Sequence, residues 1–547
     1  MLKKHLKIKM MLQTFKEKID HWHFWILGLI FALALTVRLL GVDWGMPHNN
    51  LHPDEGIIFV PAYECALNHN FEVHEYYRPN HVSIKLNTLL YVGIQELYFA
   101  PQGEMDFALN YSEHFALFTT ASRVLMALFS MGVVILAYAI ARLWGKNQAL
   151  FATFLFAVFP SFIEHSHYIT PDITLLFFLM GVLWAALCYL RKPSLSWLFW
   201  MSFFTALAVC EKYPGAYGCA IIAAVVCIAR LKKPVMILRD GLLAIFFLIL
   251  GILAVSPILL IDFRTVLDVI GGQNRQYHLG ADGLNFGQTF LFYAKTAAVH
   301  MGLILTISSI YGIVRSIKKK TKEALVLVAF LTYIVPISML SVHWERYTLP
   351  IYAAGLLFGA FGVFYIVEDL QKVLNKKLIV SLVVYFILFL LPAVSLTAGG
   401  VAVCGSFLAP DSRILYQEMF AEMNVSSYNT IYDCNTPLDP GGYYGAFNEF
   451  VAGDPAQYKY GSSPKYVMTS SSQRDLYLAA DPEVYGWIAN FYSKLDSDYA
   501  LVCLCEVENP SSYFWEIQNI WYAARSIYRY MQGAATGYEI RLYQLVP

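Results

Sequence analysis

Residues 24–42 read FWILGLIFALALTVRLLGV, an apolar run of the length that a helix needs to cross a lipid bilayer. The residues before this run are polar and basic, and no small-x-small cleavage site follows it. We therefore interpret the run as an uncleaved first membrane span rather than as a signal peptide. Its one charged residue, Arg38, lies near its C-terminal end.

The whole chain shares this apolar character. Of its 547 residues, 58% are hydrophobic and 14% are charged, and the mean hydropathy is +0.50. An ordinary soluble domain carries about 25% charged residues. The composition therefore predicts a polytopic α-helical membrane protein and excludes a soluble enzyme, a disordered chain and a nucleic-acid-binding protein.

Ten further apolar runs follow the first one. They fall at about 122–142, 148–163, 172–190, 197–210, 214–229, 240–261, 290–314, 324–342, 347–367 and 378–398. Two of them, 148–163 and 197–210, are shorter than a bilayer requires. The sequence predicts about eleven transmembrane helices.

Lysine and arginine between the runs predict the orientation. They gather in the N-terminal segment and in alternate connections, which are Arg142/Lys146, Arg191/Lys192, Arg230–Arg239, Arg315–Lys322 and Lys372–Lys377. The positive-inside rule places these connections and the N-terminus in the cytoplasm. The loop 43–121 then faces outward, and an odd number of spans also places the C-terminal region outside the cell membrane.

Two regions are unlike simple connectors. In the first outer loop, 43–121, the apolar stretch Leu86–Ala100 predicts a helix that lies along the membrane surface. From Val401 onward the chain holds 16 acidic and 8 basic residues, and strand-like runs alternate with helical ones. We expect a transmembrane domain over residues 1–400 and a soluble, extracytoplasmic α/β domain over residues 401–547.

The acidic pair Asp54-Glu55 follows the first span closely. Adjacent carboxylates at a membrane boundary are costly unless they face water or a bound group. A solvated loop that turns at Pro53 is the simpler interpretation. Arg38, near the predicted outer end of the first span, is a further charge at this membrane boundary. It marks either a functional site or a structural partner for Asp43.

A second polar set lies between the third and fourth runs and ends at Asp172. Asp172 opens a predicted helix, where a carboxylate suits the helix dipole, so an N-terminal cap explains it equally well. Because this turn faces the same side as the first outer loop, the three residues Asp54, His167 and Asp172 are compatible with a divalent metal ion. Their spacing is not a specific metal-binding motif.

The third set consists of cations on the outer side. Lys212 and Arg346 both lie at predicted outer ends of apolar runs, against the positive-inside trend. Snorkelling to lipid headgroups explains each of them alone. Together with Arg38 they offer cations at the depth of a lipid phosphate.

Carboxylates beside cations at headgroup level suit the transfer of a sugar from a lipid-linked phosphate. A carboxylate can take the proton of an acceptor hydroxyl. Cations, with or without a metal ion, can stabilise the negative charge that develops on the departing phosphate.

These motifs resemble those of the C-type (GT-C fold), polyprenyl-phosphate-sugar-dependent membrane glycosyltransferases, above all the protein O-mannosyltransferase and aminoarabinose-transferase group. The resemblance covers most of the chain and depends on the order and outer placement of short motifs. They are Asp54-Glu55, Arg123, the His-x-x-x-x-Asp turn ending at Asp172, Lys212-Tyr213, Arg346-Tyr347-x-Leu-Pro350, Asp411-Ser412-Arg413 and Phe491-Tyr492-x-x-Leu495.

The resemblance implies an inverting glycosyltransferase that moves a sugar from a polyprenyl-phosphate donor to a hydroxyl of a protein, lipid or glycan acceptor on the outer face. It implies Asp54 as the general base, Glu55 as its support and Asp172 as a second acidic residue. The donor phosphate would be held by Lys212, Arg346 and Tyr347, with Arg38 beside them. Candidates for contact with a substrate or acceptor are Lys85, His81 and His167.

The sequence departs from the family where the surface helix of the first loop begins. Relatives often carry a proline pair there, whereas this chain reads Arg78-Pro79-Asn80-His81, which leaves the acceptor side open. Two other functions compete with the transferase. One is a secondary transporter or lipid flippase, although such proteins usually show inverted repeats. The other is a noncatalytic membrane assembly subunit, which would tolerate replacement of Asp54.

Overall fold

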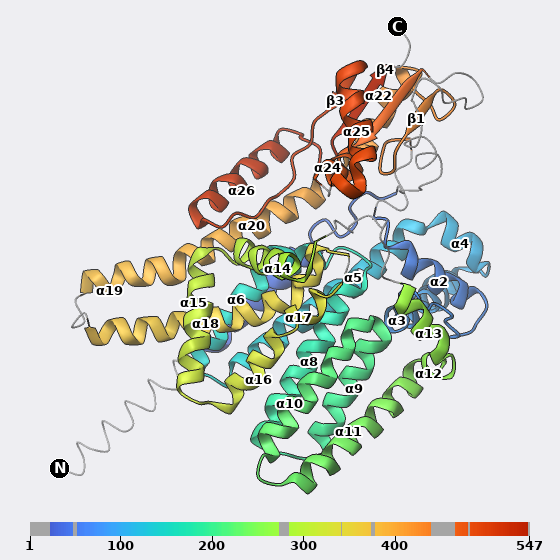
Figure 1. The fold of residues 1–547 in the computed structure, drawn as a ribbon. Helices are drawn as coiled ribbons and strands as arrows, with labels where there is room; N and C mark the ends of the chain where they lie inside the picture. Colours follow the sequence, from blue (N-terminus) through green and yellow to red (C-terminus); the bar gives the residue numbers. More distant parts are fainter. Residues whose placement is uncertain are drawn as a thin grey trace, which may run out of the picture.

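The computed structural model describes residues 22–47, 52–272, 284–340, 342–373, 378–438, 465–479 and 482–544. Its larger part is a bundle of helices, and a small mixed sheet with its own helices lies at one end of that bundle (Figure 1). This architecture confirms the predicted fold class, a polytopic α-helical protein with a C-terminal α/β region.

Seven helices in the described ranges are long and apolar enough to cross a membrane. They are Trp22–Leu39, Phe115–Ala141, Pro171–Arg191, Tyr213–Arg230, Pro234–Val255, Glu345–Lys372 and Leu382–Leu408. An eighth is counted if α14 (Phe286–Met301) and α15 (Leu303–Lys318) form one span, although they meet at a bend of 115°. The chain is therefore a multi-pass membrane protein.

The predicted count of about eleven spans is not confirmed. Three apolar runs form helices shorter than the 18 residues taken here as the minimum for a membrane span. They are α6 (Lys146–Val158), α9 (Leu195–Glu211) and α16 (Lys322–Leu331). The run predicted at 290–314 contains the bend between α14 and α15. Hydropathy reports that a run is apolar, but it does not report where the helix within that run ends or turns.

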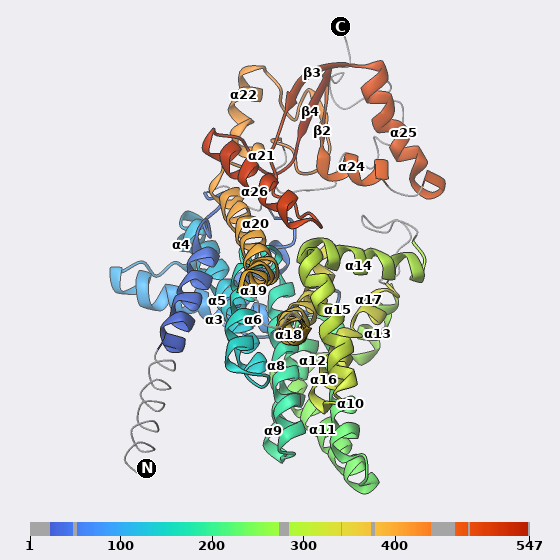
Figure 2. The ribbon, with the colours of Figure 1, turned by 90° about the vertical axis from the view of Figure 1, so that its left-hand side faces the viewer.

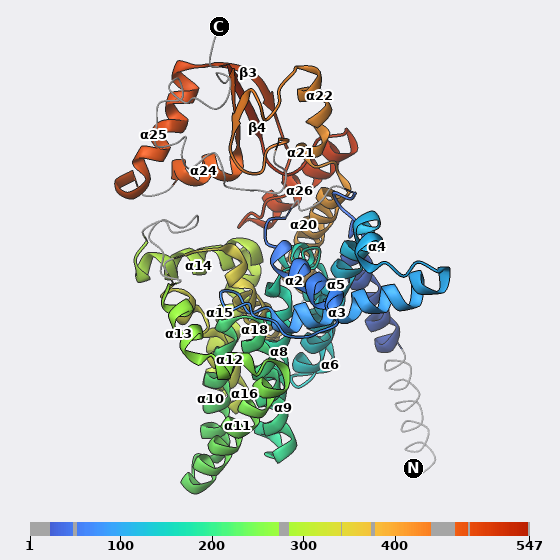
Figure 3. The same ribbon diagram turned by 90° about the vertical axis from the view of Figure 1, so that its right-hand side faces the viewer.

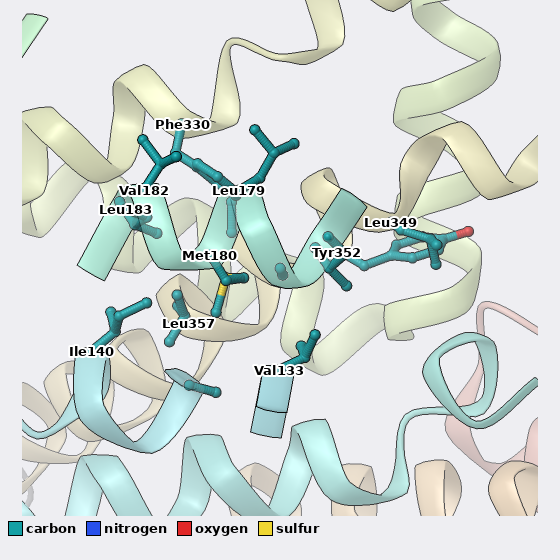
Figure 4. Packing of buried hydrophobic residues seen from close by; sticks show 14 of the residues in the cluster. Val133, Ile140, Leu179, Met180, Val182, Leu183, Phe330, Leu349, Tyr352 and Leu357 are labelled. Atoms are coloured by element: carbon teal, nitrogen blue, oxygen red, sulfur yellow. The ribbon is translucent and has the colours of Figure 1, made fainter. Parts of the chain in front are cut away.

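The core of the bundle surrounds α8 (Pro171–Arg191), which is apolar on all sides and is therefore buried by its neighbours. Figure 4 shows Leu179, Met180 and Leu183 of α8 packed among side chains from α5 (Phe115–Ala141), α16 and α18 (Leu349–Val373). Because α8 is fixed on every side, its first turn is a rigid position from which a side chain can be presented.

α15 and α18 are in backbone contact. A Cβ atom placed on Gly362 of α18 would lie 1.7 Å from the Ser308 carbonyl oxygen of α15, and one on Gly312 would lie 2.3 Å from the Phe358 carbonyl oxygen. Only glycine allows two helices to approach so closely. This contact fixes α18, whose N-terminal end follows directly after Arg346.

The first loop forms α2 (Gly56–Leu67), α3 (His81–Ile94), the π-helical turn η1 (Gln95–Phe99) and α4 (Phe107–Glu113), which lie together on one side of the bundle (Figure 3). The apolar stretch predicted as a surface helix is helical, but the helix begins earlier, at His81. Its outer face exposes Leu89 and Leu97.

The C-terminal sheet has the strand order β1-β2-β4-β3. Its strands are β1 (Thr430–Tyr432), β2 (Tyr466–Ser470), β3 (Ala500–Cys505) and β4 (Ile540–Gln544). β1 and β2 are parallel, and the other neighbours are antiparallel. All four strands fall within the strand-like runs of the sequence, which are Tyr428–Cys434, Lys465–Ser470, Tyr499–Val507 and Gly537–Leu545.

The two faces of this sheet are covered by different helices, as the period of two in a strand requires. α25 (Pro482–Asp498) buries Phe491 and Tyr492 against one face, and α22 (Gln417–Glu422) packs against the other (Figure 2). The short helices α21 (Ser412–Leu415) and α24 (Ser471–Ala479) lie beside them.

Two helices join the sheet region to the bundle. α20 (Leu391–Leu408) continues past residue 400, where we expected a domain boundary, and α26 (Glu516–Met531) packs along it. The Leu303 amide at the start of α15 donates to the Phe514 carbonyl at 2.8 Å, and the Ile304 amide donates to Glu516 Oε1 at 2.7 Å. The division into domains at residue 400 stays a prediction.

Candidate active site

Asp54 lies just before α2 and between two arginines, Arg78 and Arg346. Its Oδ1 accepts from Arg78 Nη1 at 2.5 Å, and its Oδ2 accepts from Arg346 Nη1 at 2.5 Å. The Asp54 side chain is 18% exposed, so it stays within reach of solvent. The first loop and the segment before α18 therefore meet at this carboxylate.

Asp172 lies in the first turn of α8, directly after Pro171, and pairs with the cation that follows α9. Lys212 Nζ lies 2.7 Å from Asp172 Oδ1, and Arg346 Nε lies 3.9 Å from Asp172 Oδ2. Arg346 thus lies between the two predicted acidic residues, Asp54 and Asp172. We call the five residues Asp54, Arg78, Asp172, Lys212 and Arg346 the charge cluster.

The charge cluster has an unmet requirement for negative charge. Its three cations face two carboxylates, so its formal net charge is +1. The Arg346 Nε is buried and has no hydrogen-bond partner in the described part of the chain, because 3.9 Å is too long for a hydrogen bond. Burying such a donor costs about 1–3 kcal/mol unless an acceptor reaches it. An anionic oxygen would satisfy it.

Tyr347 also lies at the charge cluster. The Lys212 Nζ lies 4.7 Å from the centre of the Tyr347 ring, within the range of a cation–π contact. The structure therefore brings together five of the predicted site residues, which are Asp54, Asp172, Lys212, Arg346 and Tyr347.

Glu211, the neighbour of Lys212, fixes the elements around the charge cluster. Its buried carboxylate accepts from the Ser83 amide at 3.0 Å and from Thr174 Oγ1 at 2.6 Å, and its carbonyl accepts from the Asn80 amide at 3.0 Å. These bonds join the end of α9, the start of α3 and the start of α8. Lys212 is therefore held in place by its neighbour.

Burial and charge act in opposite directions on Asp54. Burial alone would raise the pKa of the Asp54 carboxyl, but the positive charges of Arg346 and Arg78 outweigh burial and hold the pKa well below its usual range. In the state described here, Asp54 is ionised at neutral pH and is a weak base.

Glu55 points away from the charge cluster and forms a separate buried pair. Arg123 donates to its two carboxylate oxygens at 3.0 and 2.9 Å, and the Ile169 amide donates to Oε1 at 3.1 Å. Arg123 also donates to the Trp44 carbonyl at 2.7 Å. Adjacent residues thus differ in environment: Glu55 ties the first loop to the bundle, whereas Asp54 faces the cluster.

Arg38 does not reach the charge cluster, although we predicted that it binds the donor phosphate. Its fully buried guanidinium donates to Ser130 Oγ at 2.7 Å and to the carbonyls of Ala157 and Phe156 at 2.9 and 3.1 Å. The Phe156 carbonyl would ordinarily accept from the amide four residues later, but that residue is Pro160, which has none. Arg38 completes this helix break, and we leave it out of the site.

Two of the three predicted substrate contacts, His81 and Lys85, have partners outside the charge cluster. His81 is buried, and its ring nitrogens contact Ser256 Oγ and the Glu75 carbonyl. Lys85 donates to the Val255 carbonyl at 2.6 Å. His81 and Lys85 therefore attach the first loop to the end of α11 (Pro234–Val255).

The residues suggested for a metal ion do not form one site. Both ring nitrogens of His167 lie at backbone carbonyls, those of Ile163 and Leu40, at 2.8 and 2.9 Å. Asp54 and Asp172 are each occupied by cations. No group of three or more His, Cys, Asp or Glu side chains suited to a metal ion occurs among the residues that the structure describes. The set Asp54, His167 and Asp172 does not fit a metal ion.

A cavity of about 470 Å³ opens beside the charge cluster, between the bundle and the C-terminal region. We call it the outer cavity. His52 and Glu345, close in sequence to Asp54 and Arg346 respectively, lie in its wall. The wall of the outer cavity also includes Trp44, Ser161, Glu164, His300, Arg413, Ser511, Ser512 and Tyr538.

The bundle side of the outer cavity carries carboxylates. His300 Nε2 lies 3.1 Å from Glu345 Oε1, and its Nδ1 lies 3.1 Å from Ser161 Oγ. Burial, and then the negative charge of Glu345, raise the pKa of Glu164 to about 8. On the opposite side, Arg413 is paired with Asp411 at 2.7 Å. The outer cavity therefore suits a polar ligand that is not strongly anionic.

Three residues of this region, Arg78, Glu211 and Glu164, were not predicted from the sequence. Arg78 was noted only as part of a departure from the family pattern, yet it is one of the two cations on Asp54. Glu211 directly precedes Lys212, which was predicted. It could have been predicted as well, since a carboxylate at the end of an apolar run requires a partner. Nothing in the sequence alone places Glu164 beside Glu345.

Comparison with known proteins supports the same group of enzymes. Residues 68–267 match the family model described as dolichyl-phosphate-mannose-protein mannosyltransferase. This range includes α3, Arg123, Asp172 and Lys212. A comparison with curated protein sequences gives no match.

Three solved structures are similar over most of the chain. The Archaeoglobus fulgidus oligosaccharyltransferase tethered with an acceptor peptide has a TM-score of 0.51 at 10% identity, covering 96% of this chain and 88% of that chain. AglB of the same organism, in complex with an inhibitory peptide and a dolichol-phosphate, has a TM-score of 0.50 at 12% identity, covering 89% and 73%. ArnT from Cupriavidus metallidurans bound to undecaprenyl phosphate has a TM-score of 0.48 at 12% identity, covering 95% and 98%.

At these identities the likeness of the first two structures shows a shared fold, and the family match adds a sequence signature in the part that carries Asp172 and Lys212. The resemblance predicted from the motifs is thereby confirmed. The chain is a multi-pass membrane protein of the C-type glycosyltransferase fold, similar to the protein mannosyltransferase family over residues 68–267.

Proposed function

We propose that the chain is an inverting glycosyltransferase that moves a sugar from a polyprenyl-phosphate donor to a hydroxyl acceptor. The single observation that carries this proposal is the position of Arg346, between two carboxylates and with a buried, unsatisfied Nε. The family match over residues 68–267 supports it, and a similar fold binds a dolichol-phosphate in AglB.

The donor phosphate binds to the cations of the charge cluster. A phosphodiester carries one negative charge, which offsets the net charge of +1. Arg346 offers its unsatisfied Nε, and Arg78 and Lys212 add further donors; arginine suits phosphate because two of its N–H groups can bind at once. Asp172 holds Lys212 and faces Arg346 from the other side, so it positions these cations.

Donor binding also prepares Asp54 to act as a base. In the structure its carboxylate is tied to Arg78 and Arg346, which lower its basicity. A phosphate that takes up these guanidinium groups competes with Asp54 for them. The pKa of Asp54 then rises toward its ordinary range, and the carboxylate becomes available to a hydroxyl group.

The transfer is a single displacement. Asp54 takes the proton of the acceptor hydroxyl, and the hydroxyl oxygen attacks the anomeric carbon. The bond from that carbon to the phosphate oxygen breaks with inversion, and polyprenyl phosphate departs with its negative charge stabilised by Arg346, Arg78 and Lys212. No step here is assigned to a metal ion, because the candidate ligands do not converge.

The acceptor enters through the outer cavity, whose wall includes His52 and Glu345, close in sequence to Asp54 and Arg346 of the charge cluster. We propose that this side of the protein faces outward and that the N-terminus is cytoplasmic, as the basic connections predict. The acceptor is a protein, lipid or glycan; the weakly acidic lining of the outer cavity argues against a strongly anionic one.

The test is release of free polyprenyl phosphate from a panel of polyprenyl-phosphate sugars, with a membrane extract as the source of acceptor. We expect release by the wild type and a loss of about 100-fold or more for Asp54→Asn, because general base catalysis contributes about 10²–10⁴-fold. Asp369→Asn is the control, since this carboxylate pairs with Arg315 away from the cluster. A chelator arm tests metal dependence.

Two results would overturn the proposal. Retention of full release by Asp54→Asn would remove the base from the mechanism. Absence of release from every donor, together with movement of a labelled lipid across vesicles, would favour a flippase, and absence of both would favour an assembly subunit.

A further inference from the structure

α26 presents an apolar stripe that the sheet region does not use. The helix buries Glu516, Asn519, Ala523 and Ser526 on one face. Its opposite face exposes large apolar side chains, and Trp515 directly before the helix joins them. We call these residues the α26 stripe: Trp515, Ile517, Trp521, Tyr528 and Met531, each between 58% and 82% exposed.

The spacing within the α26 stripe places its helical members on one side. At 100° per residue, Ile517, Trp521, Tyr528 and Met531 fall within about 80° of one another around the helix axis. Arg525 and Arg529 lie next to them, each about half exposed and paired with Glu508 at 3.4 and 4.0 Å. An apolar stripe with tryptophan and tyrosine, flanked by arginine, is typical of helices at the boundary between a bilayer and water.

The position of α26 points to the same surroundings. Asn519 Nδ2 donates to the carbonyl and hydroxyl of Ser395, both at 3.0 Å, and the Tyr530 ring lies against Gly405. α26 thus follows α20 from Ser395 to Gly405, and the helices are side by side in Figures 1 and 2. Ten residues of helix correspond to about 15 Å.

α20 itself belongs to the candidate membrane span Leu382–Leu408. It exposes Val394, Val401 and Leu408, which repeat every seven residues and therefore lie on one face. A span that exposes such a face presents it to lipid. α26 packs along this span through its Asn519 face, and the α26 stripe lies on the opposite side of the helix.

We propose that the α26 stripe docks on the surface of the lipid bilayer and holds the C-terminal region on the membrane. Its tryptophan and tyrosine rings lie at headgroup level, and Arg525 and Arg529 reach lipid phosphates beside them. The region after Val401, which the sequence presents as a soluble domain, is therefore a membrane-docked one.

This docking has a consequence for the outer cavity. The chain that enters α26 contributes Asn509, Ser511 and Ser512 to the cavity wall, and the chain that leaves it contributes Thr536 and Tyr538. A single helix therefore connects both of these wall segments. If α26 is fixed on the bilayer, so is this side of the cavity.

Photo-crosslinking to lipid tests the docking directly. The crosslinker p-benzoylphenylalanine is placed at position 517, 521 or 528 of the full chain in phosphatidylcholine vesicles that carry a tagged lipid. Position 501 of β3 is the control, because Leu501 is also an exposed apolar residue. We expect at least five-fold more lipid adduct at each stripe position than at position 501. Equal adduct yields, or adducts only to a second protein chain, would overturn the proposal.

A second pair of variants tests whether the α26 stripe itself makes the contact with lipid. With the crosslinker at position 528, Trp521→Glu should lower the lipid adduct several-fold, whereas Leu501→Glu should leave it unchanged. The crosslinking needs no activity, so its result stands even if the proposed glycosyl transfer fails. If transfer is observed, Trp521→Glu should raise the KM for the acceptor and leave the KM for the donor unchanged. An unchanged adduct yield in Trp521→Glu would count against docking through this stripe.

Discussion

Arg346 donates to Asp54 at 2.5 Å across 292 positions of sequence. The pair joins the first loop to the segment before α18, the two parts of the chain that contribute Asp54 and Arg346 to the charge cluster. The same guanidinium keeps one donor, Nε, unsatisfied toward Asp172. One arginine thus restrains the proposed base and offers the proposed donor phosphate a place to bind.

Replacing Arg346 by lysine should separate charge from geometry. Arg346→Lys keeps the positive charge but loses the second donor and the Nε group. Loss of a hydrogen bond to a charged group costs about 1.5–3 kcal/mol, so kcat/KM for the donor should fall by about 10- to 100-fold. The measurement is steady-state release of polyprenyl phosphate. Arg191→Lys, at an exposed pair with Glu323, is the control and should match the wild type.

The buried pair of Glu55 and Arg123 should contribute to stability rather than to catalysis. Arg123→Met leaves the Glu55 carboxylate buried without its partner, which costs about 3–5 kcal/mol in comparable cases. We expect a clear fall in Tm in detergent or nanodiscs. Arg191→Met at the exposed pair should change Tm little, because such pairs contribute about 0–1 kcal/mol. An unchanged Tm for Arg123→Met would refute the structural role.

Glu164 predicts a pH dependence of stability. Its pKa in the folded chain is about 8, against an ordinary value of 4.5. Between these values the folded protein keeps a proton that the unfolded chain releases, so the free energy of unfolding falls as the pH rises. Glu164→Gln has no such proton, and its Tm relative to the wild type should increase from pH 5 to pH 8. A difference in Tm that stays constant from pH 5 to pH 8 would contradict this role of Glu164.

The close approach of α15 and α18 should not tolerate a methyl group. In Gly362→Ala the new Cβ would lie 1.7 Å from the Ser308 carbonyl oxygen, so the helices must separate. Overpacking of this kind costs about 1–3 kcal/mol, and we expect a lower Tm and weaker donor turnover, because α18 follows Arg346. Gly28→Ala is the matched control, since nothing lies within 4 Å of its added Cβ. Equal Tm values for the two variants would argue against this contact.

Much of the charge cluster could be predicted because charged residues are conspicuous beside apolar runs. Asp54, Asp172, Lys212 and Arg346 each follow or precede such a run, and a charge there requires a partner or a ligand. The sequence does not report which charges meet. Arg78 joins Asp54 through the folding of the first loop, and Arg38 binds instead to groups near a helix break, among them the Phe156 carbonyl that Pro160 leaves free.

The fold class and the four C-terminal strands were also within reach, since both follow from local patterns of apolar residues. The number of spans was not, because the bend between α14 and α15 and the short α16 leave the hydropathy unchanged. α26 was missed for a related reason. Its apolar residues are interspersed with polar and charged ones, and its pattern has meaning only once α20 is placed beside it.

The bond from the Ile304 amide to Glu516 concerns the order in which the chain is made. The first turn of α15 finds acceptors for its free amides in Phe514 and Glu516, which are synthesised about 210 residues later. Until then these amides must rely on water or lipid headgroups. A chain that stops before residue 514 therefore leaves a helix unfinished inside the bundle. The residues around Phe514 and Glu516 therefore take part in the assembly of the bundle. Their loss by premature termination or by a protease would also affect the membrane part of the protein.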